Sequence, residues 1–318
     1  MILLLEPPRP AGFVSGGYRY QAEIGARLAA RGEGELRVVA PDALAAAVAA
    51  ARGPVVVDGL FAALGAGPLP AGAIALLHLV PPQRPWSAAP LPVVATSLPT
   101  AAAVAADSLA VEVVRPGLDA CFVPGPPRPA DGRRRIVCIG TVSPAKGQLL
   151  LATAVAAARC ARQCDLVLLG DALTWPDHAR AVERAAAPAT VAVRGAVPPT
   201  TVADELRRAD LFVSASRSES FGMAVAEAVA CGAPVLAFAT GEIATFVRDG
   251  GNGWLLPADA DDGAFAARLG ALLADPAALR AARDRAVRPP LGDWDQAATR
   301  FAAACRRLHG GPQKRSPT

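Results

Sequence analysis

The chain has few aromatic residues, few charges and no organised cysteine pattern. Aromatic residues make up 5% of its 318 residues and charged residues 19%, while hydrophobic residues make up 53%. The six cysteines fall at no spacing typical of a disulfide framework or a zinc site. Reduced thiols in a cytosolic protein are therefore expected, with no metal. A net charge of +4 does not indicate a nucleic-acid partner.

The sequence also lacks a long apolar run. Every hydrophobic stretch is interrupted by proline or charge before it reaches membrane-spanning length. The opening residues, MILLLEPPRP, lack the basic start of a signal peptide. We therefore expect a soluble, cytoplasmic protein, with peripheral contact at the inner membrane face left open. The one dense basic run, Arg133-Arg134-Arg135, is interpreted as the solvated start of a strand.

Short β-branched runs alternate with Ala-rich helical segments along the whole chain. This alternation is typical of an α/β fold in which helices cover parallel sheets. Strands are predicted at Ile2–Leu5, Leu36–Ala40, Val55–Asp58, Ile74–Leu79, Val93–Thr96, Val111–Val114, Arg135–Ile139, Leu166–Leu169, Val191–Val193, Leu211–Ser214, Val235–Phe238 and Trp254–Leu256. Helices are predicted at Tyr18–Ala30, Ala43–Ala51, Lys146–Ala161, Thr200–Ala209 and Phe221–Ala230.

A segment rich in proline and glycine, PGPPRPADGRRR at residues 124–135, divides the chain into two modules. We predict an N-terminal Rossmann-like domain at 1–127 and a C-terminal one at 133–290, with a disordered tail at 310–318. Ligands of such sheets bind beyond the carboxyl ends of the strands. Two modules of this kind predict a cleft between them.

Lys146 lies in the loop that follows the first strand of the second module. In RRIVCIGTVSPAKGQLLL the strand ends at Gly140, and Lys146-Gly147 is expected to open a helix. A lysine beside free amides at a helix start makes an anion site. The alternative is an exposed lysine at a helix end, because the phosphate-loop glycine spacing is missing.

Two glutamates stand in the otherwise small and apolar stretch SESFGMAVAEAVACGAPVLA. Glu219 is expected in the loop after a strand, and Glu227 about two turns into the next helix. A carboxylate accepts hydrogen bonds from a diol such as that of ribose. Among small, apolar neighbours Glu227 is either on a narrow wet face or buried with a partner.

The block ESFGMAVAEAVACGAPV resembles the signature of the retaining family 4 glycosyltransferases, which have the GT-B fold. Other segments follow in the family's order. They are SGGYRYQAEIGARLAARG, GTVSPAKGQ, VRGAVPPTTVADELRRADLFVSAS and GNGWLLPADADD. The resemblance covers nearly the whole chain, closely in the second module and loosely in the first. It implies that the helix at 293–308 packs back onto the first domain.

The resemblance also implies roles for individual residues, with a nucleotide-diphosphate sugar as donor. Lys146 would neutralise the leaving diphosphate, Glu219 would hold the donor sugar and Glu227 the ribose. His78, at the end of AIALLHLV, would stand beside the sugar, or else it only caps a strand. The other residues assigned to donor binding are Gly16, Gly17, Thr141, Gly195, Ser220, Phe221, Gly222 and Met223.

Two loops depart from the family pattern, at three positions. Thr141 replaces the arginine of its GRL loop, and Arg217 or Arg19 is a candidate replacement. In GEIAT, residues 241–245, Glu242 replaces a glycine and Thr245 a glutamate. The DADD run at 259–262 matches the metal-binding pattern of a different glycosyltransferase fold, but it is interpreted as the cap of a helix at Gly263–Leu273.

The resulting prediction is a retaining, metal-independent hexosyltransferase that uses a UDP- or GDP-sugar and needs no cofactor. Its acceptor is a glycan, a lipid or a small metabolite, and its base, sugar, acceptor and oligomeric state stay open. The alternative is a catalytically silent GT-B protein that binds a sugar nucleotide or a partner. A nicotinamide enzyme is disfavoured because neither module has GxGxxG after its first strand.

Overall fold

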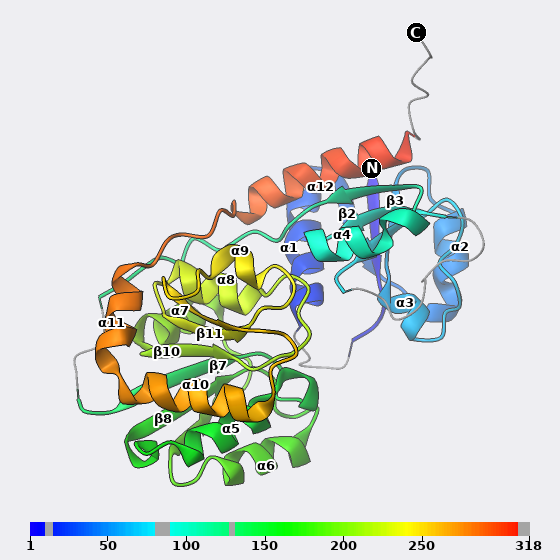
Figure 1. Cartoon of the computed structure of the whole chain (residues 1–318). Helices are drawn as coiled ribbons and strands as arrows, with labels where there is room; N and C mark the ends of the chain where they lie inside the picture. The colour runs from blue at the N-terminus through cyan, green and yellow to red at the C-terminus, as the bar shows by residue number, and fades with distance from the viewer. Residues whose placement is uncertain (10–14, 80–89, 127–130, 311–318) are drawn as a thin grey trace. The chain divides into compact units, whose positions relative to one another are not determined.

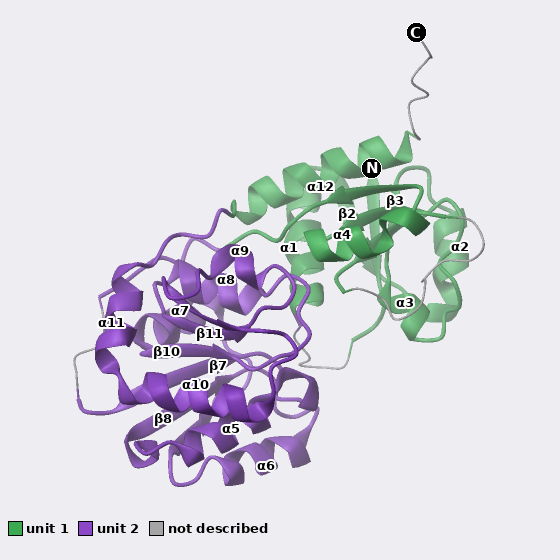
Figure 2. Cartoon of the chain, viewed as in Figure 1, with its two compact units in different colours: residues 1–11, 16–118, 291–318 green, residues 12–15, 119–290 purple. Residues whose placement is uncertain are grey.

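A computed structural model describes residues 1–9, 15–79, 90–126 and 131–310 (Figure 1). The chain forms two compact units, which Figure 2 shows in different colours. The first contains Gly16–Leu118 with the first strand and the C-terminal helix, and the second contains Asp119–Pro290. Residues 311–318 of the predicted tail and 127–130 of the predicted linker lie outside the described part.

The first unit is built on a six-stranded parallel sheet in the order β2-β1-β3-β4-β5-β6. Its strands are β1 (Ile2–Glu6), β2 (Gly34–Val38), β3 (Val55–Asp58), β4 (Ile74–Leu77), β5 (Pro92–Ala95) and β6 (Ala110–Val113). Its helices are α1 (Gly16–Ala30), α2 (Leu44–Ala49), α3 (Leu60–Ala63), α4 (Leu98–Val104) and α12 (Trp294–His309). Strands β1, β3 and β4 are buried throughout, which explains their continuous apolar sequences.

The C-terminal helix α12 packs against α1 within the first unit (Figure 1). Tyr20 of α1 makes edge-to-face contacts with Trp294 and Phe301, at centroid distances of 6.1 and 6.3 Å. The Tyr20 hydroxyl donates to the carbonyl of Val114 at 3.0 Å. Arg31 pairs with Asp295 on the exposed side of the same contact. Aromatic packing therefore joins α12 to α1, although the two helices lie far apart in the sequence.

The second unit repeats the architecture with the strand order β12-β11-β10-β7-β8-β9, again all parallel. Its strands are β7 (Arg134–Ile139), β8 (Cys164–Leu169), β9 (Thr190–Val193), β10 (Leu211–Ser214), β11 (Val235–Phe238) and β12 (Gly253–Leu256). Its helices are α5 (Gln148–Ala157), α6 (Pro176–Ala185), α7 (Pro199–Arg208), α8 (Met223–Ala230), α9 (Ile243–Phe246), α10 (Asp262–Ala274) and α11 (Pro276–Asp284).

The second unit includes residues from Asp119 onward, ahead of the boundary that the sequence places at residue 127. Arg207 of α7 is the physical reason for this difference. Its guanidinium donates to the carbonyls of Cys121 and Val123, the latter at 3.0 Å. These bonds hold the segment against the second unit although it precedes the proline-rich run.

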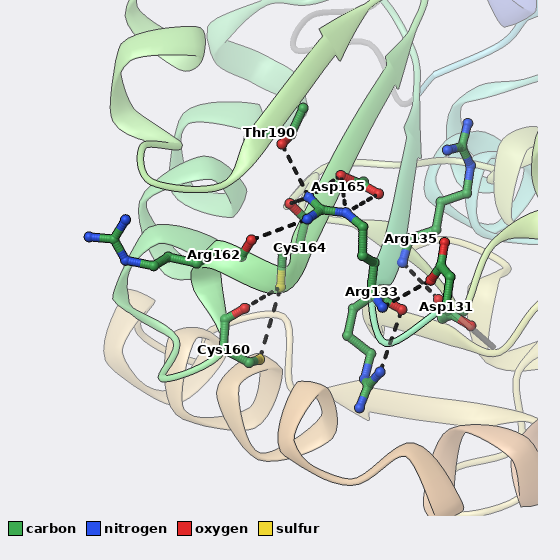
Figure 3. Close-up of polar contacts among 10 residues, drawn as sticks. Asp131, Arg133, Arg135, Cys160, Arg162, Cys164, Asp165 and Thr190 are labelled. Atoms are coloured by element: carbon green, nitrogen blue, oxygen red, sulfur yellow. Dashed lines mark hydrogen bonds and ion pairs between the residues drawn. The ribbon is translucent and has the colours of Figure 1, made fainter.

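The basic run at the start of β7 is engaged in ion pairs at the amino edge of the sheet. Figure 3 shows Arg133 directed toward Asp165 of β8 and the hydroxyl of Thr190. Arg135 pairs with Glu205 of α7, a carboxylate that is 4% exposed. Strand β7 begins at Arg134, so the position of the run at a strand start is confirmed, but Arg135 is 13% exposed and paired with Glu205, and so it is not solvated.

The cysteines and the acidic DADD run also have structural explanations. All six cysteines are free, and the sulfurs of Cys160 and Cys164 lie 3.9 Å apart (Figure 3). Asp261 caps α10 by accepting a hydrogen bond from the amide of Ala264 at 2.7 Å, as expected.

Among the described residues, no cluster of three or more acidic, histidine or cysteine side chains is placed to hold a metal ion. None of the described helices has the length and apolar character needed to cross a bilayer.

Candidate functional site

Glycines end three neighbouring strands of the second sheet. Gly140 follows β7 and Gly170 follows β8, both with φ of +143°, and Gly195 follows β9 with φ of +66°. A Cβ atom on Gly170 would lie 2.2 Å from the carbonyl oxygen of Gly140, so only glycine fits there. The amide of Gly170 donates to the carbonyl of Gly195 at 2.8 Å. The glycines therefore let the backbones of neighbouring strand ends approach one another closely at the carboxyl edge.

Lys146 ends a 3₁₀ turn, Pro144–Lys146, and does not open a helix. Its amide donates to the carbonyl of Ser143 at 3.0 Å, and Gly147 follows in the left-handed conformation with φ of +69°. Helix α5 begins only at Gln148. The helix therefore starts two residues later than predicted, because the proline-initiated turn comes first and Gly147 is the N-cap of α5.

The Lys146 turn packs tightly against the loop after β10. A Cβ atom on Gly147 would lie 2.2 Å from the carbonyl oxygen of Ala215. The buried Ser216 hydroxyl donates to the carbonyl of Ala145 at 3.4 Å. Strands β7 and β10 are neighbours in the sheet, so the loops that leave their carboxyl ends meet.

This packing brings Lys146 and Glu219 into direct contact, with the ammonium nitrogen 2.5 Å from a carboxylate oxygen. Their side chains are 35% and 17% exposed. The Lys146 ammonium is therefore neutralised by Glu219 yet remains accessible to a ligand. Solvent at such exposure screens the pair, so it contributes little to stability.

The residue type at position 146 carries a signal that the sequence analysis missed. Lys146 is one of only two lysines in the chain, the other being Lys314, although lysine and arginine together number 32. Nearly all other basic residues of the chain are arginines, whereas position 146 is a lysine, whose side chain ends in an ammonium group. An ammonium is a compact charge on a flexible stem, whereas a guanidinium is a rigid planar fork.

Helix α8 begins at Met223, two residues later than predicted. Gly222 is its N-cap, with φ of +84°, and a Cβ atom there would lie 2.8 Å from a side-chain carbon of Ile243. The first intrahelical bond runs from Ala226 to the carbonyl of Gly222. The amides of Phe221, Gly222 and Met223 thus stand at the positive end of the helix, just after the Glu219 loop.

Phe221 and Ser220 hold this helix start in place. Phe221 is 4% exposed, and its ring lies 5.2 Å from that of Phe246 in α9. The carbonyl of Ser220 accepts a hydrogen bond from the amide of Glu242 at 3.0 Å. Phe221 therefore serves in the core, and its backbone alone is available to a ligand.

Glu227 is buried, which removes the wet-face alternative. It is 3% exposed in the middle of α8. Burial raises the pKa of the neighbouring Cys231 thiol to about 12, and the negative charge of Glu227 adds to that rise, although Arg207 opposes it. Glu219 lies in the loop before α8 and Glu227 in the middle of the helix, so the two carboxylates belong to different elements of the signature.

The loop that departs from the family pattern braces Glu219. A Cβ atom on Gly241 would lie 2.4 Å from the carbonyl oxygen of Glu219. Thr245, in place of the family's glutamate, donates from its hydroxyl to the carbonyl of Glu242 at 2.7 Å. Glu242 is itself 1% exposed. The substituted loop is thus closely packed against the backbone of the signature.

Arg217 does not replace the cation that is absent at Thr141. Its guanidinium donates to the carbonyl of Ala260 at 2.6 Å and to the carboxylate of Asp262 at 2.7 Å. The same group lies over the ring of Phe238, 4.4 Å from its centroid. These contacts tie the signature loop to the start of α10. The hypothesis that Arg217 supplies the missing charge is not supported.

Gln148 is a structural residue of the site that the sequence analysis missed. It is 1% exposed, donates to the carbonyl of Thr141 at 2.9 Å and accepts from the amide of Ser143 at 3.4 Å. The side chain thereby fixes the loop between β7 and the Lys146 turn. A glutamine at the first position of an otherwise apolar helix was the available signal.

The remaining predicted residues lie in the first unit. Gly16 begins α1, and Gly17 follows in its first turn. A Cβ atom on Gly17 would lie 3.1 Å from the ring of His78, which comes directly after β4. Burial lowers the pKa of His78 and the charge of Asp58 partly opposes this, so the imidazole is neutral at pH 7. Its ring lies edge-to-face against Tyr20 at 5.3 Å.

Sequence comparison identifies relatives of this chain. Residues 133–275 match the family model described as Glycosyl transferases group 1. A D-inositol 3-phosphate glycosyltransferase of Xylanimonas cellulosilytica is 36% identical over 232 residues, which is 67% of this chain and 54% of that protein. One from Segniliparus rotundus is 33% identical over 222 residues, 65% of this chain and 49% of that protein. The chain thus spans about half the length of these curated relatives.

Solved structures resemble the chain over nearly its whole length. Sucrose-phosphate synthase from Thermosynechococcus elongatus superposes with a TM-score of 0.74 at 20% identity, covering 97% of this chain and 99% of that one. Anabaena HepE in complex with UDP and glucose gives 0.70 at 19% identity, covering 96% and 99%. At such identities the likeness shows the fold, and that fold is GT-B.

Proposed function

Because residues 133–275 belong to the glycosyl transferases group 1 family, we propose that this protein transfers a sugar from a nucleotide-diphosphate sugar to an acceptor. One observation carries the proposal. The Lys146 ammonium and the Glu219 carboxylate meet at the carboxyl edge of the second sheet, and the open start of α8 follows Glu219 directly. Positive charge for a diphosphate and an acceptor for sugar hydroxyls thus come from adjacent loops.

The proposed roles follow from the chemistry of these groups. Lys146 would stabilise the negative charge that develops on the departing diphosphate, with the amides at positions 221–223 acting on its oxygens. Glu219 would accept hydrogen bonds from the transferred sugar, and the buried Glu227 from the ribose. His78, being neutral, would interact by hydrogen bonding and not by charge.

The proposal has three finer parts. The transferred group is a hexosyl group, the configuration at the anomeric carbon is retained, and no metal is needed. Glycosyl transfer passes through an oxocarbenium-like state as the phosphate leaves, and positive charge near the diphosphate favours that departure. Lysine and a helix N-terminus are both sources of such charge. UDP-glucose is the first donor to test because HepE, which shares the fold, was solved with UDP and glucose. GDP-mannose is the second.

The test combines nucleotide binding with donor turnover. Calorimetric titration with UDP, GDP and ADP should reveal one preferred base, and the matching nucleotide sugar should be hydrolysed or transferred. Replacing Lys146 with Met should lower kcat by about 10²-fold or more, the usual effect of removing a group that stabilises transition-state charge. Lys146→Arg should recover only part of this loss, because a planar fork does not reproduce an ammonium in a tight turn.

Arg162→Met is the matched control. Arg162 is an exposed cation on the same unit that precedes β8, away from the carboxyl edge (Figure 3). Its loss should leave both nucleotide affinity and kcat unchanged. An equal loss of activity in Arg162→Met, or full activity in Lys146→Met, would contradict the assignment of Lys146.

A silent sugar-nucleotide-binding protein is the second candidate. The observation in its favour is that Thr141 replaces a basic residue of the family while Arg217 is engaged by Asp262 and Phe238. Under this alternative a nucleotide sugar binds, but it is neither hydrolysed nor transferred at any concentration. Turnover of any nucleotide sugar that depends on Lys146 excludes the alternative.

A further inference from the structure

Two carboxylates end neighbouring strands at the carboxyl edge of the first sheet. Glu6 is the last residue of β1, and Asp58 is the last residue of β3. The register pairs Leu5 with Val57, so the next residues, Glu6 and Asp58, lie side by side. Their exposed fractions are only 3% and 5%. Two buried carboxylates next to each other are costly unless something binds them.

Both carboxylate oxygens of Asp58 accept hydrogen bonds, whereas its neighbours Glu6 and Gln21 are only partly hydrogen-bonded within the described residues. The amide of Leu60 donates to one Asp58 oxygen at 2.9 Å, and the side-chain amide of Gln21 to the other at 2.5 Å. Gln21 is fully buried in α1. Within the described residues, one oxygen of Glu6 and the side-chain oxygen of Gln21 are buried and have no hydrogen-bond partner. We call Glu6, Gln21 and Asp58 the Glu6 cluster.

The Glu6 cluster thus has more acceptors than donors. A buried acceptor left without a donor is destabilising, so a ligand that supplies donors would remove that cost. A hydroxyl or an ammonium group is such a donor, whereas a phosphate dianion brings only acceptors and negative charge. Within the described part of the chain, the cation that influences Glu6 is Arg9, an exposed guanidinium that lies over the Tyr18 ring at 5.5 Å.

The electrostatics agree with this reading of the geometry. Burial raises the pKa of Glu6, and the charge of Asp58 raises it further while Arg9 lowers it. The pKa of the buried Tyr18 phenol is raised by burial and by both carboxylates. Negative charge is therefore already unfavourable at this edge, and a further anion would be more so.

We propose that the Glu6 cluster binds the acceptor through its hydroxyl or ammonium groups, and that the acceptor carries no phosphate there. This inference rests on the proposed glycosyl transfer and names the class of acceptor, an uncharged or cationic polyol. It separates this chain from the relatives, whose names specify inositol 3-phosphate. Glu6 and Gln21 would determine specificity, and Asp58 would position Gln21.

The test uses pairs of probes that differ by one phosphate. These are myo-inositol and its 3-phosphate, glucose and its 6-phosphate, and glucosamine and its 6-phosphate. Binding is measured by calorimetry on the full chain saturated with its preferred nucleotide, and the KM of each acceptor is measured with the matching donor. The unphosphorylated member of at least one pair should bind about tenfold or more tightly than its phosphorylated partner.

The variant Glu6→Gln keeps the shape of the side chain and removes its charge. It should weaken the unphosphorylated probe about tenfold and reduce the discrimination against phosphate, with the KM for the donor unchanged. A merely structural role would instead alter thermal stability and both KM values together. Glu35→Gln, an exposed carboxylate of β2 that pairs with Arg37, is the matched control and should change neither.

Each outcome decides the inference. It is overturned if the phosphorylated members bind equally or better, if no probe binds, or if Glu6→Gln leaves the discrimination intact. Nucleotide binding is measured separately, and its absence contradicts the proposed function. If no nucleotide binds but unphosphorylated probes are preferred, and Glu6→Gln removes that preference, the result supports the ligand preference of the Glu6 cluster and not the proposed function.

Discussion

Gly147 offers a direct test of the packing that brings Lys146 to Glu219. It has φ of +69°, and a Cβ atom there would lie 2.2 Å from the carbonyl oxygen of Ala215. Gly250 has the same φ of +69°, lies in the same unit and has no atom within 4 Å of an added Cβ. The variants Gly147→Ala and Gly250→Ala therefore share the same backbone strain and differ in the steric clash.

The expected magnitudes follow from these two terms. A Cβ in the left-handed conformation costs roughly 1–2 kcal/mol, which is the full expected effect for Gly250→Ala. In Gly147→Ala the carbonyl of Ala215 must also move, and such overpacking costs a further 1–3 kcal/mol approximately. The free energy of unfolding should thus fall by about 2–5 kcal/mol in Gly147→Ala. The difference between the variants measures the contact.

Urea unfolding followed by far-ultraviolet circular dichroism measures these changes. With m values of roughly 1–3 kcal/mol/M, the midpoint of Gly147→Ala should lie about 1 M below that of Gly250→Ala. Donor turnover should also fall in Gly147→Ala alone, because the Lys146 turn is displaced. Equal midpoints for the two variants would refute the close approach of the turn to β10.

Three further predictions concern Gln148, His78 and Asp261. Gln148→Leu leaves the buried amide of Ser143 without its acceptor and should destabilise the second unit by about 1–3 kcal/mol in the same urea assay, with unchanged stability contradicting its role. The lowered pKa of His78 means that the unfolded chain binds more protons below pH ~6.5. The free energy of unfolding should therefore be highest above that pH and should decrease as the pH falls. His78→Asn should reduce this dependence on pH, whereas His309→Gln, at an exposed position, should not. Asp261→Ala removes the N-cap of α10 and should cost about 1 kcal/mol of thermal stability, with Asp261→Asn close to wild type.

Several elements were predictable from local patterns. The strands Val55–Asp58, Leu211–Ser214 and Val235–Phe238 have the predicted bounds. Each is a short apolar run with clear flanks, and buried parallel strands need little more than that. The α/β class and the parallel sheets are confirmed.

Helix starts at the site were less predictable. Helices α5 and α8 both begin two residues after their predicted starts, each preceded by a glycine in the left-handed conformation. The shape of those glycine turns depends on neighbours from other strands, Ala215 for Gly147 and Ile243 for Gly222. Helical periodicity contains no information about such contacts, because the partners are distant along the chain.

The order of residues along the chain accounts for the two α/β modules, the signature block and the identity of the charged side chains. Folding accounts for which of those charges meet. Lys146 pairs with Glu219 across 73 residues because β7 and β10 are adjacent strands. Glu6 lies beside Asp58 because β3 follows β1 in the first sheet. Strand order depends on the packing of the whole sheet, and so the charges that meet at its carboxyl edge do too.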